Sequence, residues 1–137
     1  MTLSRIPRVL MPLAVLSCLA ASAFGASPAS AATTRTCNQS SFSGGYFTQV
    51  RATGLSCTSA RRVMVAYNSC RIAAGGKRGN CNGKTIRPRI GSRRISFRCS
   101  ESRPPELQIP TQVNASVTCR RSSGTTKVRF KYQQNLD

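Results

Sequence analysis

Alternating basic residues near the end of the chain are the feature of this sequence that points most directly to chemistry. Lys127, Arg129 and Lys131 are separated by single residues, and Arg94 and Arg98 accompany a second alternating stretch. Successive side chains of a β-strand point to opposite faces, so each set should lie on the solvent side of its strand. If the two strands share a sheet, the five cations form a patch that binds phosphate or carboxylate groups. The alternative is an ordinary solvated sheet face.

The charge of the whole chain favours the same class of ligand. The sequence has 21 Lys plus Arg and 3 Asp plus Glu, a balance that attracts anionic polymers or anionic lipid headgroups. Phe97, Phe130 and Tyr132 fall on the opposite side of their strands from the cations. The basic residues therefore lack the aromatic platform that stacks on bases, and sequence-specific binding of nucleic acid is not expected. The alternative is that the charge reflects genome composition and serves only solubility.

Groups for acid, base or nucleophilic catalysis are scarce. The chain has no His, so it cannot form a Ser–His or Cys–His pair. Glu101 and Glu106 fall in a Pro-rich connector, where nothing supports a glycosidase-type carboxylate pair, and nothing singles out a Ser–Lys pair. Residues 78–85 resemble a phosphate-binding P-loop, but Arg78 replaces its first Gly and a helix end precedes it, so we interpret the match as coincidence. The sequence predicts a protein that is not an enzyme and has no cofactor.

The first 31 residues have the layout of a secretory signal peptide. Arg5 and Arg8 precede an apolar run over residues 9–20, and small residues follow as far as Ala31. Signal peptidase reads this layout, and the apolar run is shorter than the roughly 20 residues that span a membrane. We therefore predict a secreted, extracellular product without a transmembrane segment. The alternative is a lipid anchor through Cys18, whose neighbours resemble a lipoprotein box.

Removal of the signal peptide would leave an even number of cysteines. The count falls from seven to six, and the 21 basic residues less Arg5 and Arg8 leave 19 against three acidic ones, a net charge of +16. Six cysteines in a small exported chain predict three disulfides. No C-x-x-C pair and no His is present, so a metal site is not indicated. The expected pairs are Cys37–Cys57, Cys70–Cys81 and Cys99–Cys119.

The scaffold expected for these residues is a small α+β domain over 46–137. Residues 32–45 are polar and predict a flexible leader. Apolar residues over 57–74 fall on one helical arc, with Ser56 as the N-cap and Gly75 at the end. A basic, Gly-rich loop over 75–94 follows. Strands are expected at 46–52, 95–99, 113–119 and 128–132. The predicted fold is one helix packed on a three- or four-stranded antiparallel sheet, cross-linked by disulfides.

One segment also resembles a known group of proteins. Residues 54–63, Gly-Leu-Ser-Cys-Thr-Ser-Ala-Arg-Arg-Val, are similar to a G-[LV]-S-C-x-x-A-R helix start in small exported cysteine-containing proteins of actinobacterial type. Phe97-Arg98-Cys99 and the segment 119–130 look like the later strand and final hairpin of those proteins. The resemblance implies a bacterial protein that is exported and has a similar fold. That group is largely uncharacterised, so the resemblance implies no catalytic residue.

Two hypotheses about function follow. The first is a secreted basic protein that binds polyanions at the cell surface or in the medium. The second is a disulfide-stapled protein-interaction or inhibitor module whose 75–94 loop contacts a protein partner. Raising the ionic strength discriminates them, because electrostatic binding of a polyanion weakens steeply with salt.

Overall fold

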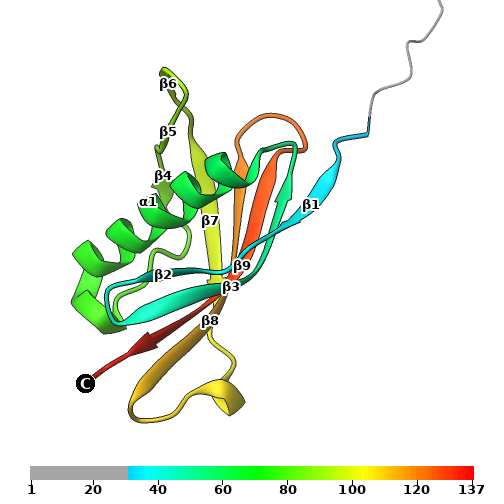
Figure 1. The fold of residues 1–137 in the computed structure, drawn as a ribbon. Coiled ribbons are helices and arrows are strands. Elements are labelled where there is room, and N and C mark those ends of the chain that lie inside the picture. Colours follow the sequence, from blue (N-terminus) through cyan, green and yellow to red (C-terminus); the bar gives the residue numbers. More distant parts are fainter. Residues whose placement is uncertain (1–30) are drawn as a thin grey trace, which may run out of the picture.

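The computed structural model describes residues 31–137 (Figure 1). The described chain has one α-helix, α1 (Cys57–Gly75), and two short 3-10 helices, η1 (Gly76–Arg78) and η2 (Pro105–Leu107). The strands are β1 (Thr34–Cys37), β2 (Ser40–Phe42), β3 (Gly45–Thr53), β4 (Thr85–Ile86), β5 (Arg89–Ile90), β6 (Arg93–Arg94), β7 (Phe97–Ser102), β8 (Gln112–Arg121) and β9 (Lys127–Asn135). The predicted signal peptide lies outside the described residues except for Ala31, as does Cys18.

The main sheet is antiparallel and has the strand order β1-β3-β9-β8-β7-β4, with β2 paired to the other end of β3. Strands β5 and β6 pair only with each other. The prediction of an α+β fold with one helix is confirmed. The predicted number of strands, three or four, was wrong, because the sheet has seven. The additional strands are two to four residues long. Strands of that length are too short to show an alternating pattern in the sequence.

The apolar core lies between α1 and one face of the sheet (Figure 1). On the longest strands every second side chain is buried, as in the series Val113, Ala115, Val117 and Cys119 of β8. Phe130 of β9 lies in the middle of this core. Its ring meets the rings of Phe47 and Tyr67 nearly edge-on, with centroids 5.4 and 5.6 Å apart, a favourable arrangement of aromatic rings.

Helix α1 begins and ends close to the predicted positions. The Ser56 Oγ accepts a hydrogen bond from the Ser59 backbone N–H at 3.2 Å, which satisfies one of the free N–H groups of the first turn. At the other end, Gly76 has a φ of 61° and its N–H donates to the Ile72 carbonyl. A positive φ favours glycine, so the Gly-Gly pair terminates the helix here.

Strand β3 contains an irregularity that explains its imperfect alternation. Its register against β9 shifts between Thr48 and Arg51, and Gln49 has a φ of 49°. The irregularity changes the spacing of the buried side chains from two residues to three, from Phe47 to Val50. Such a β-bulge keeps the apolar side chains on the core face on both sides of the shift.

The three disulfides have the pairing expected from the sequence. Cys37–Cys57 joins β1 to the start of α1, and Cys70–Cys81 joins the last turns of α1 to the following loop. Cys99 and Cys119 lie directly opposite each other on β7 and β8, with their Cα atoms 4.0 Å apart. The disulfides therefore fix both ends of the helix and the centre of one strand pair.

Two segments that we expected to be irregular contain strands. Residues 32–45 do not form a flexible leader, because β1 and β2 both pair with β3. The loop over 75–94 includes η1, β4, β5 and β6, and the last two strands form a projecting arm (Figure 1). These segments are ordered by backbone pairing with a neighbouring strand and by a nearby disulfide. Neither interaction requires apolar side chains.

Candidate functional site

The sheet face opposite α1 carries rows of basic side chains from neighbouring strands. In one row, Arg98 of β7 is opposite Arg120 of β8, which is opposite Lys127 of β9. In another, Arg51 of β3 is opposite Arg129 of β9. We define the outer-face patch as the six cations of this face: Arg51, Arg98, Arg120, Lys127, Arg129 and Lys131.

A shallow hollow lies within the outer-face patch, beside the bulge of β3. It has a volume of about 400 Å³. Its polar lining consists of three patch cations, three hydroxyl side chains and one amide: Arg51, Arg129, Lys131, Thr36, Ser116, Thr118 and Gln49. Hydroxyl groups donate hydrogen bonds to anionic oxygens, and guanidinium groups bind phosphate or carboxylate with two parallel hydrogen bonds. The hollow therefore has the donors that an anionic group requires.

Like charges face each other directly across these strands. The pairs Arg98 with Arg120, Arg120 with Lys127, and Arg51 with Arg129 are all opposite in the register. Like charges in directly opposite positions destabilise a sheet, by a few tenths of a kcal/mol to about 1 kcal/mol for each pair. The arrangement is therefore unfavourable for the isolated fold and becomes favourable when an anion lies across it.

The structure brings together four of the five cations that the sequence singled out. Arg98, Lys127, Arg129 and Lys131 belong to the outer-face patch. Arg94 does not, because it lies on β6 opposite Arg89 and lines a different groove beside α1.

Sequence reasoning missed two members of the patch. Arg120 directly follows Cys119 in an alternating strand, so its outward direction was detectable. Arg51 follows the bulge of β3, which hides its direction from any count of alternating residues.

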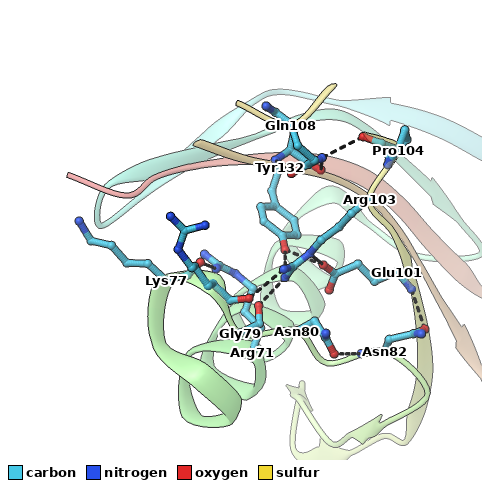
Figure 2. A network of polar contacts seen from close by, with 12 residues as sticks. Arg71, Lys77, Gly79, Asn80, Asn82, Glu101, Arg103, Pro104, Gln108 and Tyr132 are labelled. Atoms are coloured by element: carbon cyan, nitrogen blue, oxygen red, sulfur yellow. Dashed lines mark hydrogen bonds and ion pairs between the residues drawn. The ribbon is translucent and has the colours of Figure 1, made fainter. Parts of the chain in front are cut away.

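A polar network inside the fold centres on the Glu101 carboxylate (Figure 2). The Tyr67 hydroxyl donates to one of its oxygens, and the Tyr132 hydroxyl donates to the other at 2.8 Å. Arg103 Nε–H donates to that second oxygen at 2.5 Å. The Glu101 side chain is 1% exposed and belongs to β7, although we expected it in the Pro-rich connector. It is the next inward position of β7 after Phe97 and Cys99, a signal that the sequence contained.

The same network determines the protonation of its members. Burial raises the pKa of Tyr132 to about 12, and the negative charge of Glu101 adds to the effect. Burial by itself would lower the pKa of Arg103, but its hydrogen bond to Glu101 and the attraction of Tyr132 and Glu101 outweigh this and raise it. Arg103 also donates to the Gly79 carbonyl at 2.6 Å, so the network ties the end of β7 to the turn that follows α1.

Arg71 of α1 is fully buried beside this network (Figure 2). Its guanidinium donates to Gln134 Oε1 at 2.5 Å and to the Lys77 carbonyl at 3.1 Å. Its central carbon lies 4.6 Å from the centroid of the Tyr132 ring and 5.2 Å from that of Phe42, within the range of cation–π attraction. Burial lowers the pKa of Arg71, and these contacts compensate for part of the lost hydration.

The Glu101 carboxylate is closed to a substrate, because its side chain is buried and its oxygens accept hydrogen bonds from Tyr67, Tyr132 and Arg103. Over residues 31–137, no group of three or more His, Cys, Asp or Glu side chains is arranged to hold a metal ion. In the same range, no helix combines the length and apolar character needed to cross a membrane. The outer-face patch is therefore the candidate binding site that the described residues support best.

Comparison with protein-family models, with curated proteins and with solved structures finds no match to this chain.

Proposed function

We propose that this chain is an exported, non-enzymatic protein that binds polyanions through the outer-face patch. Export is supported by the layout of residues 1–31 in the sequence and by the three disulfides, which persist in oxidising compartments. Binding is supported by the six cations on one sheet face and by a hollow among them that presents hydroxyl groups.

The observation that carries the proposal is the direct opposition of like charges in neighbouring strands. Arg98, Arg120 and Lys127 lie side by side on three strands. Of the acidic residues in the described chain, Glu101 is buried and Asp137 lies beyond the last strand, whereas Glu106 lines a neighbouring pocket with Lys131 at the margin of the patch. A long polyanion that crosses the strands meets several of these cations at once and releases its own counterions, which favours binding at low salt.

The test replaces Lys127, Arg129 and Lys131 of β9 with Gln. We expect weaker retention on heparin and a shallower dependence of affinity on salt, by roughly two units in the log–log slope, because about three fewer counterions are released. Stability should be unchanged or increase by up to about 1 kcal/mol, because opposite like charges are removed and no core contact is lost.

A matched variant separates the patch from net charge. Arg61, Arg87 and Arg93 are exposed and lie on α1 and the β4–β6 segment, so replacing them with Gln removes the same charge elsewhere. Heparin retention should fall clearly more for the β9 variant. Equal losses would show that total charge alone determines retention. Unchanged retention in the β9 variant would contradict the proposal and favour a protein-interaction role for the 75–94 segment.

A further inference from the structure

A second cationic surface lies on the other side of the molecule, between α1 and the segment of β4 to β6. We define it as the arginine groove; its volume is about 920 Å³. On the helix side it is lined by Thr58, Arg61, Arg62, Val65, Ala66, Ser69 and Cys70, and on the other side by Ile86, Arg87, Pro88, Arg89 and Arg94. Every charged side chain of this lining is an arginine.

The charges gather toward one end of the arginine groove. Arg61 and Arg62 belong to the early turns of α1, and Arg62 Nη1 donates to the Arg89 carbonyl at 3.2 Å. Arg94 is the register partner of Arg89. We call Arg61, Arg62, Arg89 and Arg94 the arginine cluster; Arg87 lines the same groove.

The groove becomes apolar along the helix beyond this cluster. Val65 and Ala66 follow the arginines by one turn. The opposite wall contains Ile86 and Pro88, both largely buried, with the exposed Arg87 between them. The Val65 side chain is 52% exposed. A ligand that covered it would remove apolar surface from water at about 25 cal/mol for each Å².

We propose that the arginine groove binds a fatty acid, with the carboxylate at the arginine cluster and the acyl chain over Val65 and Ile86. Guanidinium groups bind a carboxylate in a planar, two-hydrogen-bond geometry. The groove volume is within the range of small-molecule sites, about 300–1,000 Å³. On the helix side of the groove the arginines and the apolar residues are segregated, as are the two ends of an amphiphile. This inference rests on different residues from the proposed polyanion site.

The test measures the affinity of the purified, oxidised protein for cis-parinaric acid, a fluorescent fatty acid, and its displacement by palmitate. Val65→Asp, at an exposed position, should weaken binding at least about tenfold, because the acyl chain would meet a carboxylate. The double variant Arg89→Gln and Arg94→Gln should weaken it to a similar extent, because the carboxylate loses charge-assisted hydrogen bonds. Hexadecanol, which has the chain without the charge, should bind at least about tenfold more weakly than palmitate.

Two control variants leave the groove intact. Ile72→Asp changes an exposed apolar residue of α1 outside the lining, and Lys127→Gln changes the outer-face patch. Both should keep the wild-type affinity for the fatty acid, and Val65→Asp should keep the wild-type retention on heparin. The proposals for the two sites can therefore be confirmed or contradicted independently of each other.

Three results would overturn the assignment. The first is no saturable binding of the fatty acid. The second is an equal effect of Val65→Asp and Ile72→Asp, which would indicate non-specific adsorption. The third is displacement of the probe by a polyglutamate peptide as effectively as by palmitate, which would assign the groove to acidic peptides.

Discussion

At the scale of single residues, the stability of this protein depends on a few buried polar groups in a chain with few acids. Glu101 receives hydrogen bonds from two tyrosines and one arginine, and Arg71 is buried between aromatic rings. A buried charge whose partner is removed is strongly destabilising. The Glu101 network should therefore contribute more to folding than any exposed charge of the molecule.

Replacing Glu101 with Gln should lower the free energy of unfolding by about 2–3 kcal/mol, because Arg103 loses its anionic partner and the tyrosine hydroxyls lose a charged acceptor. Arg103 is partly exposed, with 25% of its side chain accessible, which limits the effect. The exposed Glu106 provides the control. Glu106→Gln should change stability by less than about 0.5 kcal/mol. Urea unfolding checks both, and similar values for the two variants would contradict the role given to Glu101.

The raised pKa of Tyr132 predicts a loss of stability in alkali. Its ordinary pKa is 10.0 and its folded value is about 12. Below pH 10 the phenol is protonated in both states and its contribution is fully present. Between these two values the unfolded chain releases the proton first, so stability falls as the pH rises, by up to roughly 3 kcal/mol in total.

Unfolding measured from about pH 9 to about pH 12 should show a weaker alkaline loss for Tyr132→Phe than for wild type. Tyr46→Phe, at an exposed position, should follow the wild-type curve. If Tyr132→Phe also follows that curve, the phenol does not titrate as its surroundings imply.

At the scale of elements, the disulfides hold segments that have few apolar contacts of their own. Strand β1 has no buried residue and pairs only with β3. Cys37–Cys57 connects β1 to the first turn of α1. The order of this edge should therefore depend on the disulfide more than the order of the central strands does.

The double variant Cys37→Ala and Cys57→Ala should lose about 2–4 kcal/mol of stability. Hydrogen exchange should accelerate first at residues 34–37, while β8 and β9 keep their protection. The matched variant without Cys70 and Cys81 should instead expose the segment after α1. Unchanged protection of residues 34–37 would show that pairing with β3 is sufficient to order β1.

The sequence predicted the elements whose pattern is strong and long. The helix was detectable from its apolar arc and its Ser56 cap, and β8 and β9 from clean alternation. The helix excluded only a Cys57–Cys70 bond, so the three expected pairs were one choice among the pairings that remained, and the structure has them. Strands β1, β2, β4, β5 and β6 could not be predicted, because their order comes from backbone pairing with residues distant in the sequence.

The part of the candidate site that lies on a single strand could be predicted from the sequence. Lys127, Arg129 and Lys131 follow from alternation along a single strand. Arg94 was wrongly placed with them because the alternation was extended back across residues 95 and 96, which separate β6 from β7. The Arg98, Arg120 and Lys127 row depends on the register of three strands. Pairing partners and register come from tertiary packing, which one sequence does not reveal.

At the scale of the whole molecule, positive charge is distributed over two separate surfaces. The outer-face patch lies on the side opposite α1, and the arginine groove lies along α1. Charge removed from one surface leaves the other intact, so the two proposals can be tested with the same set of variants. It also means that net charge by itself does not identify a binding site in this protein.

Strand β9 is the last described strand to be synthesised, yet it lies in the middle of the sheet between β3 and β8. Until it emerges, those two strands lack a shared partner and the core lacks Val128, Phe130 and Tyr132. A growing chain therefore cannot complete its sheet early. Under the proposed export, this would keep the chain unfolded and able to pass through an export channel. Chains that end before Lys127 should be degraded rapidly by protease, whereas those that include β9 should resist. Resistance of the shorter chains would show that the first part of the protein folds before its central strand arrives.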